Sequence, residues 1–443
     1  MQLLLLTITL LLITACRLTS PASSPTPSLP PTATPLPAPT DTAPEPGFAV
    51  DPSALPEAPR YDIDLTIDPN GTQVTGHQRI GYTNAETEPL DEIVIRLFPN
   101  TPGYGGAMTV DRVQLNGTPA SPTAELENSA LRLPLAPPLA PGERVTITLD
   151  FTVTVPTALN TGYAQLSTVN GVTALANVYP LIPVYDDEGW NAELAVPYGD
   201  AVTSDVAFYT VDVATSSTLD LVASGSCTMP APGAWECTAG PMRDFVLVLG
   251  PDYQRITQEV DGTLVNGYHY PDHAESGEWV LEIAADAFAV FSDLFGAYPY
   301  AEFDVVETPT SAGGIEYPGL VVISDRLYGG QGEYAEWVVV HEVAHQWWYG
   351  LVGNDQVDEP WLDEALTQYS SLLYFETAYG ADTAADIVET NFEQAHQRLI
   401  DSGNDMPVGL PVAAYSPALY SPVVYQKGPL YFHALREMVG DEA

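Results

Sequence analysis

The sequence predicts a multidomain protein with an N-terminal all-β domain, a saddle or sandwich, followed by an α+β domain. Apolar and polar residues alternate in the first half, whereas the second half contains long apolar stretches without proline. A chain of 443 residues is also too long for one ordinary hydrophobic core. We expect the β domain to cover residues 59–250 and the α+β domain residues 251–443.

Strict alternation predicts the strands of the β domain. Tyr61, Ile63, Leu65 and Ile67 alternate with polar residues, which is the period of a strand with one buried face. The same pattern returns over residues 145–155. Shorter apolar runs, separated by Pro, Gly and Asn, occupy residues 92–98, 206–213 and 245–249.

After Pro251 the pattern changes to that of helices. Residues 278–294 and 333–349 form the long stretches without proline, and two short strand candidates, 303–307 and 319–324, lie between them. Helices interleaved with strands predict the α+β domain.

The N-terminus resembles that of an exported lipoprotein. The apolar run of residues 3–13 is too short to span a bilayer, so residues 1–15 are interpreted as a signal peptide. The run ends in Ile-Thr-Ala-Cys, which resembles a bacterial lipobox, and cleavage there would leave a lipidated Cys16 as the first residue. Met1 and Gln2 carry no positive charge, so ordinary secretion with an incidental Cys16 stays an alternative.

Residues 16–58 are predicted to form a disordered stalk, because Pro, Thr, Ser and Ala dominate and few large apolar residues are available for a core. Lipid and stalk together predict a protein anchored to the outer face of a bacterial cell membrane, with a secreted form as the alternative.

Charge excludes one class of partner. The formal net charge is -45, from 58 acidic and 13 basic residues, and nucleic acid needs a basic face. We therefore expect no nucleic-acid partner. The acidic composition is interpreted as a means of solubility or as a response to a salty habitat.

Cys227 and Cys237 bracket a loop that contains Pro and Gly, so a disulfide is expected if the compartment is oxidising, with free buried thiols as the alternative.

A metal-binding motif lies within the second predicted helix. His341 and His345 are four residues apart, so both imidazoles lie on one face and can share a metal ion. Glu364, near the start of a further helix candidate, can supply a carboxylate as third ligand. Two imidazoles, one carboxylate and an open position suit Zn²⁺, one per chain. Zinc lowers the pKa of its water to about 7, and Glu342 is placed to take the proton as the water attacks.

Two further segments are compatible with peptide hydrolysis. Gly313 and Gly314 would let the backbone approach a substrate, and Glu316 offers a carboxylate to an ammonium group. Tyr425 offers a phenol to the oxyanion that forms at the scissile carbonyl. Taken alone, a Gly-Gly turn and a surface Tyr are more often structural.

Over residues 59–443 the sequence resembles the zinc aminopeptidases typified by aminopeptidase N, which include the leukotriene epoxide hydrolase branch. The resemblance implies a β domain followed by a thermolysin-like catalytic domain. It also implies that Glu342 is the general base, Tyr425 the transition-state tyrosine, Tyr420 a second active-site tyrosine and Glu316 the amine-binding glutamate. The zinc ligands of the family match His341, His345 and Glu364.

This sequence departs from the family in four ways. Asp363 and Ala365 stand where Asn and Gly are usual, and Tyr317 replaces the Asn that closes the family's exopeptidase motif. The β domain shows no arginine-containing segment with a second amine anchor. The chain ends soon after Gly428, so we expect a catalytic domain that is incomplete at its C-terminus.

The sequence therefore predicts a metallo-aminopeptidase that hydrolyses N-terminal residues from peptides by attack of zinc-bound water. Tyr317 leaves an endopeptidase or another hydrolase on the same scaffold as an alternative. A catalytically silent relative that binds peptides is a second alternative. Peptides and a membrane, through the N-terminal lipid, are the expected partners, and the sequence makes no prediction of oligomeric state.

Overall fold

The fold is described from a computed structural model, which covers residues 48–159, 163, 165–194, 196–216 and 218–441. The described residues all belong to one compact unit. No helix among the described residues is long and apolar enough to cross a membrane. The predicted signal peptide and Cys16 lie outside the described residues.

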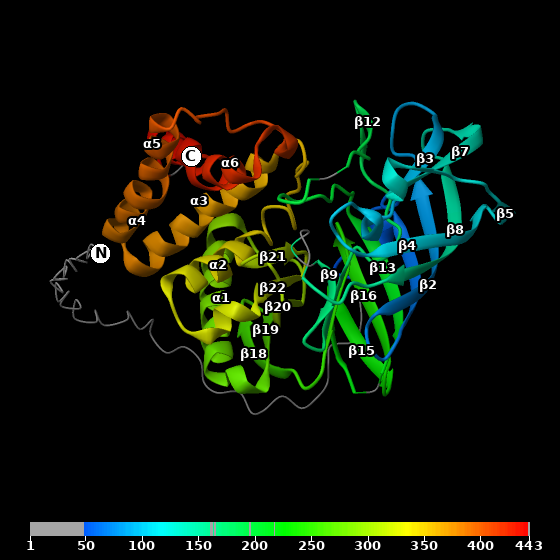
Figure 1. Ribbon diagram of the computed structural model, residues 1–443, viewed down its shortest axis with the longest axis horizontal. Coiled ribbons are helices and arrows are strands. Elements are labelled where there is room, and N and C mark those ends of the chain that lie inside the picture. Colours follow the sequence, from blue (N-terminus) through cyan, green and yellow to red (C-terminus); the bar gives the residue numbers. More distant parts are fainter. Residues whose placement is uncertain (1–47, 160–162, 164, 195, 217, 442–443) are drawn as a thin grey trace, which may run out of the picture. The chain divides into compact units, whose positions relative to one another are not determined.

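The expected N-terminal β-rich domain is built on an eight-stranded sheet in the order β15-β16-β13-β1-β2-β8-β4-β5 (Figure 1). Its strands are β1 (Arg60–Ile67), β2 (Gln73–Thr83), β4 (Ala107–Leu115), β5 (Thr118–Pro119), β8 (Arg144–Thr154), β13 (Ala207–Ala214), β15 (Ser226–Ala231) and β16 (Ala234–Met242). β1 runs parallel to β13 and antiparallel to β2. Alternate residues of β1 and β8 are buried, as the alternation of apolar residues predicts.

Smaller sheets complete this domain, in the orders β14-β17-β10-β9, β3-β7-β6 and β11-β12. Their strands are β3 (Leu90–Arg96), β6 (Thr123–Glu125), β7 (Ala130–Leu139), β9 (Leu166–Val169), β10 (Val172–Ala176), β11 (Tyr185–Asp186), β12 (Gly189–Trp190), β14 (Asp220–Ala223) and β17 (Val246–Gly250). Tyr61, Tyr179, Tyr209 and Phe245 form a fully buried aromatic group in the core, in which the rings of Tyr61 and Tyr209 stack at 5.0 Å.

A five-stranded sheet follows, in the order β18-β19-β20-β22-β21. Its strands are β18 (Gln254–Val260), β19 (Thr263–His269), β20 (Glu302–Thr308), β21 (Gly314–Tyr317) and β22 (Leu320–Ser324). β19, β20 and β22 are parallel, and β21 pairs antiparallel with β22 at the edge. In the described part of the chain, the second side of β21 pairs with no strand and so has backbone groups free to bind another chain.

Helices cover this sheet and continue beyond it (Figure 1). They are α1 (Ala274–Phe295), α2 (Glu333–Ala344), α3 (Pro360–Tyr379), α4 (Ala381–Ile387), α5 (Gln394–Asp401), α6 (Pro417–Ser421) and α7 (Pro429–Val439), with π-helical segments at Val388–Glu393 and Pro422–Lys427. Phe288, Phe291 and Trp347 are buried between α1 and the segment that follows α2.

The predicted helix 333–349 is shorter than expected, because α2 ends at Ala344 and His345 caps it. Trp347 donates to the Gly296 oxygen and Trp348 to Ser370 Oγ. Tyr349 adopts a φ of 87°, which no right-handed helix accommodates. The helix therefore stops where the tryptophans take their places in the core.

The end of the predicted stalk is also ordered, contrary to the prediction for residues 16–58. Pro52–Ala54 forms a short 3₁₀ helix capped by the Asp51 side chain. The Phe48 ring packs edge-on against Phe208 at 5.1 Å, and Ala49 N donates to the Gly240 oxygen. An aromatic anchor and backbone pairing supply the contacts that composition alone did not predict.

Cys227 and Cys237 lie directly opposite each other in β15 and β16, and a disulfide joins them.

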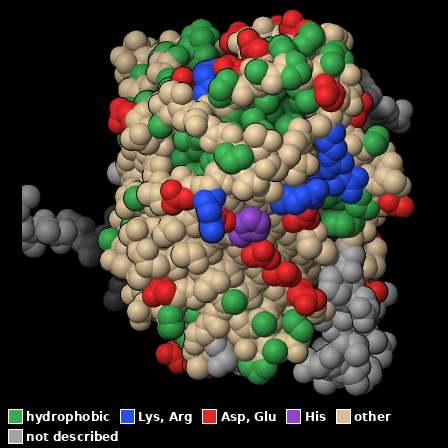
Figure 2. All heavy atoms as spheres, turned by 90° about the vertical axis from the view of Figure 1, so that its right-hand side faces the viewer, with side chains coloured by type: hydrophobic (Ala, Val, Ile, Leu, Met, Phe, Trp, Pro, Cys, Tyr) green, Lys and Arg blue, Asp and Glu red, His purple; other side chains and the backbone are tan. Residues whose placement is uncertain are grey.

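The outward side of the β-rich domain carries charges of both signs. Figure 2 shows Lys and Arg side chains in groups beside a histidine, with acidic side chains interspersed. In the eight-stranded sheet, His77 Nδ1 lies 2.6 Å from Asp150 Oδ1, and Arg79 pairs with Asp62 at 3.0 Å. Exposed ion pairs of this kind contribute little stability, so we interpret this face as a solvated surface.

Candidate active site

The three predicted metal ligands meet between two helices. His341 lies in the last turn of α2, His345 caps that helix, and Glu364 lies near the start of α3. All three are buried, with exposed fractions of 7%, 1% and 3%. The i, i+4 spacing places both imidazoles on one face, and the packing of α2 against α3 brings Glu364 to them.

The spacing of the ligand atoms fits a tetrahedral zinc ion. The Nε2 atoms of His341 and His345 are 3.1 Å apart, and Glu364 Oε2 lies 3.2 Å from the first and 3.4 Å from the second. Bonds of about 2.0–2.2 Å in a tetrahedron separate the ligands by roughly 3.3–3.6 Å. Glu364 Oε2 is buried and accepts no hydrogen bond, as expected of an atom that serves a metal.

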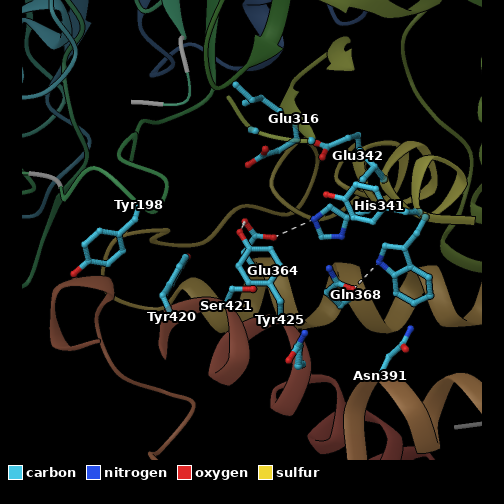
Figure 3. Close-up of a pocket in the computed structure, with 18 of the residues that line it drawn as sticks. Tyr198, Glu316, His341, Glu342, Glu364, Gln368, Asn391, Tyr420, Ser421 and Tyr425 are labelled. Atoms are coloured by element: carbon cyan, nitrogen blue, oxygen red, sulfur yellow. Dashed lines mark hydrogen bonds and ion pairs between the residues drawn. The ribbon is translucent and has the colours of Figure 1, made fainter. Parts of the chain in front are cut away.

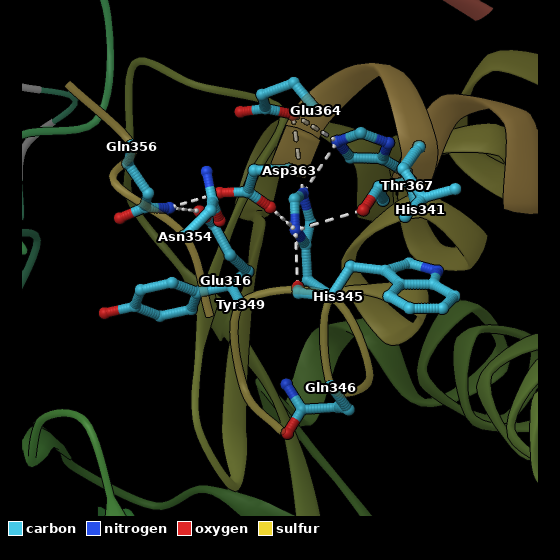
Figure 4. A network of polar contacts seen from close by, with 12 residues as sticks. Glu316, His341, His345, Gln346, Tyr349, Asn354, Gln356, Asp363, Glu364 and Thr367 are labelled. Atoms are coloured by element: carbon cyan, nitrogen blue, oxygen red, sulfur yellow. Dashed lines mark hydrogen bonds and ion pairs between the residues drawn. The ribbon is translucent and has the colours of Figure 1, made fainter. Parts of the chain in front are cut away.

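A second layer of polar groups orients His345 (Figure 4). Asp363 Oδ1 lies 2.8 Å from His345 Nδ1, and the Trp348 backbone oxygen lies 3.2 Å from the same nitrogen. The Thr367 hydroxyl also lies 3.3 Å from this nitrogen. The Asp363 and Trp348 oxygens can only accept, so Nδ1 carries the proton and Nε2 keeps its lone pair for the metal. Gln356 donates to Asp363 Oδ2 at 2.5 Å and to Glu316 Oε1 at 3.2 Å.

Glu342 lies between the two histidines in sequence and faces β21. A Cβ atom added at Gly314 would lie only 2.5 Å from Glu342 Cγ, so the glycine makes room for this carboxylate. Glu342 Oε2 is buried without a hydrogen-bond partner. Figure 3 shows Glu342 between Glu316 and His341. The carboxylate therefore lies beside both the metal ligands and the free edge of the sheet.

These residues line a cavity of about 730 Å³ to which both domains contribute (Figure 3). Tyr425 comes from the π-helical segment Pro422–Lys427, and its hydroxyl donates to Glu364 Oε1. The Tyr420 ring lies 5.7 Å from that of Tyr425, and its hydroxyl is buried without a partner. Both phenols are therefore near the predicted metal site.

Glu316 and Tyr317, neighbours in β21, point in different directions. Glu316 lines the cavity and is 8% exposed. Tyr317 is not among the residues that line the cavity and belongs to an apolar cluster with Val306 and Leu320. Period-2 geometry separates the two side chains, so the unusual Tyr317 does not occupy the space next to Glu316.

Asp200 is a site residue that sequence reasoning missed. It comes from the irregular segment between β12 and β13 of the β-rich domain and lines the cavity. One oxygen each of Asp200, Glu316 and Glu364 lie within 4.8 Å of one another. The residue belongs to no periodic element or motif, so local sequence pattern carried no signal for it.

The electrostatics of these carboxylates favour a bound cation. Burial raises the pKa of Glu316 well above its ordinary value, and the Asp200 charge raises it further. Burial likewise raises the pKa of Asp200, with Glu364 as the next cause. Burial also raises the pKa of Glu342, and Glu316 adds to the effect. Carboxylates this close repel one another unless positive charge lies between them.

The fold and the His-His-Glu site resemble those of the gluzincin class of zinc metallopeptidases. Residues 279–443 match the family model described as Peptidase family M1 domain. Rat aminopeptidase B is 28% identical over 167 residues, which are 36% of this chain and 26% of that protein. Human aminopeptidase B is 26% identical over 245 residues, 51% of this chain and 37% of the relative. This chain thus spans well under half the length of these relatives.

Solved structures agree in fold. The M1 zinc metallopeptidase of Deinococcus radiodurans matches with a TM-score of 0.61 over 87% of this chain and 84% of that one, at 21% identity. A mutant two-domain M1 zinc metallopeptidase bound to L-arginine matches with a TM-score of 0.62. The match over residues 279–443 confirms the resemblance to the zinc aminopeptidases of peptidase family M1 that the metal motif carries.

Proposed function

We propose that this protein is a zinc-dependent aminopeptidase that removes N-terminal residues from peptides. One observation carries the proposal. Three ligand atoms at tetrahedral spacing lie beside an unpartnered carboxylate, Glu342, in a cavity whose other carboxylates, Glu316 and Asp200, suit an ammonium group. The M1 family model covers these ligands, and the Deinococcus radiodurans mutant has been crystallised with a Tyr-Ser-Ala substrate.

Each side chain has a distinct role in the proposed reaction. Zinc, when held by His341, His345 and Glu364, would supply a Lewis acid for the peptide carbonyl and lower the pKa of water. Glu342 takes the proton from the attacking water and passes it to the leaving amine. The Tyr425 hydroxyl donates a hydrogen bond to the oxygen on which negative charge develops.

The exopeptidase assignment depends on recognition of the free amine. An α-ammonium ion inside the cavity has lost its water, which is costly unless carboxylates replace it. An ammonium nitrogen that donates hydrogen bonds of about 2.8 Å to two oxygens at a tetrahedral angle holds these oxygens roughly 4.6 Å apart. The carboxylates of Glu316 and Asp200 satisfy that limit, since their oxygens lie within 4.8 Å. We infer that Asp200 supplies the second amine anchor for which the β-domain sequence showed no motif.

The test compares one peptide with a free and with an acetylated N-terminus, with products identified by mass. Wild-type protein loaded with zinc should cleave the first bond of the free peptide and leave the acetylated peptide nearly untouched. Asp200→Asn and Glu316→Gln should each lower kcat/KM for the free peptide by about 30- to 4000-fold, the range for truncating one partner of a buried charge pair. Glu342→Gln should retain zinc and lose turnover.

Equal cleavage of both peptides, or cuts at internal bonds, would replace this proposal by an endopeptidase. Zinc binding without turnover on any peptide would favour a silent peptide-binding protein.

A further inference from the structure

Arg398 is the one lysine or arginine among the described residues that line the active-site cavity. It lies in α5 and is exposed, and its guanidinium makes no hydrogen bond or ion pair within the described residues. Basic residues on neighbouring elements are paired: Lys427 contacts Asp405 at 2.5 Å, and Arg436 contacts Glu376 at 2.6 Å. A free arginine in a chain with 58 acidic and 13 basic residues is therefore available for a ligand.

The polar residues of the cavity are unevenly distributed. Glu316, Asp200 and Glu364 gather within 4.8 Å of one another. Gln368 and Asn391 also line the cavity and are uncharged, and Glu333, a further acidic residue of the lining, is exposed at the start of α2. Figure 3 places Gln368 and Asn391 on the side of Glu364 opposite Tyr198 and Tyr420. Asn391 lies in the π-helical segment Val388–Glu393, which leads directly into α5. Arg398, in α5, therefore belongs to the same side of the cavity as Asn391.

The direction of a bound peptide follows from β21. With its amine at Glu316, a peptide that pairs with the free edge of this strand extends past Gly314 and Gly313. Beyond Gly313 it meets the first turns of α2, because a Cβ at Gly313 would lie 3.1 Å from Val338 and 3.3 Å from the Tyr334 hydroxyl. Tyr334 and Val338 line the cavity with Asn391 and Arg398. The residues that follow the scissile bond thus run toward the arginine.

The size of the cavity limits how far the peptide extends. A volume of about 730 Å³ lies in the range that buries a drug-sized ligand, equivalent to a peptide of about two to four residues. A substrate of this length ends within reach of the rim. Its α-carboxylate would be repelled by a protein of net charge -45 unless a cation receives it.

We propose that Arg398 binds the terminal α-carboxylate of the substrate, so that the enzyme is selective for short peptides with a free C-terminus. The guanidinium can hold a carboxylate through two parallel hydrogen bonds. The cavity then recognises a short zwitterionic peptide at both ends, with acidic residues at its amine and Arg398 at its carboxylate. This inference rests on the proposed aminopeptidase function.

The test uses the full chain loaded with zinc and three forms of one tripeptide: the free acid, the C-terminal amide, and an amide with Glu as the last residue. An aminoacyl reporter without a carboxylate measures the basal hydrolysis. Wild type should cleave the free acid with a kcat/KM about 10- to 100-fold above the amide, the value of one charge-assisted pair. Arg398→Gln should bring this ratio close to one, and Arg398→Lys should restore part of it. Added salt should lower the wild-type ratio, because the carboxylate contact lies near solvent.

Arg144→Gln is the matched control. Arg144 lies on β8 and lines no part of this cavity, and its guanidinium also makes no hydrogen bond or ion pair within the described residues, so its loss changes the net charge equally. It should leave the acid-to-amide ratio at the wild-type value.

Several results would overturn the proposal. Wild type could cleave the acid and the amide equally while it hydrolyses the reporter, or Arg398→Gln could keep the wild-type ratio. Arg398 could raise kcat/KM only for the peptide that ends in Glu amide. The arginine would then bind an acidic side chain of the substrate and not its terminal carboxylate. A wild type that hydrolyses neither reporter nor peptide would instead contradict the proposed aminopeptidase function.

Discussion

Asp363 shows how a side chain outside the ligand set can control the metal site. It lies 2.8 Å from His345 Nδ1 and is itself held by Gln356. It is 1% exposed, so this contact is shielded from bulk solvent. An acceptor at this position fixes both the ring orientation and the tautomer of His345. The family usually has Asn here, which offers an acceptor oxygen in the same place.

Removing this acceptor should weaken zinc binding. Asp363→Ala should lower zinc affinity by about 10- to 100-fold, the usual effect of losing a hydrogen-bond partner of a metal ligand. Asp363→Asn should lower zinc affinity less than Asp363→Ala does, because the amide oxygen of Asn can still accept a hydrogen bond from His345 Nδ1. Competition with a chelator of known affinity measures both variants without reference to activity. Equal affinities for Asp363→Ala and wild type would show that the Trp348 oxygen and the Thr367 hydroxyl orient His345 without Asp363.

At the scale of elements, β21 and α2 together line one side of the active-site cavity. The strand presents a free edge, and the helix presents Glu342 to it across Gly314. Gly314 is needed here for space, since its backbone does not adopt the left-handed conformation.

Filling that space should impair turnover more than folding. Gly314→Ala places a methyl group 2.5 Å from Glu342 Cγ, so the base must shift. We expect a loss of about 100-fold in kcat, because a displacement near 1 Å at a catalytic group has that effect. Gly313→Ala is the control: its nearest contact is 3.1 Å, to Val338, and it should lose much less. Zinc content and Tm of both variants, measured alongside, should stay near wild type, and a kcat for Gly314→Ala within a few-fold of wild type would contradict the steric account.

The segment after α2 links the two domains through a buried acid. Arg243 Nε donates to the Tyr349 oxygen at 2.9 Å, and the Tyr349 hydroxyl donates to Asp244 Oδ2 at 2.7 Å. Asp244 is 2% exposed, and its second oxygen has no partner. Burial raises the pKa of Asp244 from 3.8 to about 6, although the Tyr349 hydrogen bond opposes the shift.

This raised pKa should make stability depend on pH in a definite direction. Folding favours the protonated acid, so its stabilising contribution is complete below about pH 4 and is lost as the pH rises through 6. The loss amounts to about 3 kcal/mol at most, by the conversion of 1.36 kcal/mol per pKa unit. Asp244→Asn should therefore unfold at a higher temperature than wild type at pH 7 and at a similar one at pH 4. A constant difference in Tm between the two proteins from pH 4 to 7 would contradict this origin.

At the scale of the whole molecule, the active site belongs to both domains. Asn191 of the β-rich domain donates to Asp355 at 2.7 Å, just before α3, and the Tyr198 hydroxyl donates to the Tyr415 oxygen at 2.8 Å. Asn191 and Tyr198 lie in the segment between β12 and β13, and Asp200 of the same segment lines the cavity. The β-rich domain is therefore expected to contribute to substrate recognition as well as to stability.

The N-terminal motif leads to a prediction about location. If Cys16 carries lipid, the full chain expressed in a bacterium should partition with membranes, and Cys16→Ser should move it to the soluble fraction, because lipid chains supply the hydrophobic anchor. Fractionation followed by immunoblotting measures this. Equal distribution of the two forms would favour plain secretion.

Motif spacing and periodicity predicted the local features well. The His-x-x-x-His pair shares a face because helix geometry repeats within a few residues, and alternation predicted β1 and β8 because side chains of a strand point to alternate faces. These are short-range steric effects, so they can be recognised in the sequence. Residue chemistry proposed Glu364 and Tyr425, and the family resemblance supported them, because no local pattern connects either residue to the histidines.

Only the tertiary structure showed the end of α2 at Ala344, the contact of Asp363 with His345, and the approach of Asp200 and Arg398 to the cavity. These features depend on packing between segments that are far apart in the chain. Asp200 lies in an irregular segment more than a hundred residues before the metal motif, so its position depends on how the β-rich domain packs against α3. Long-range packing has no local period, and for that reason substrate recognition was harder to predict than metal binding.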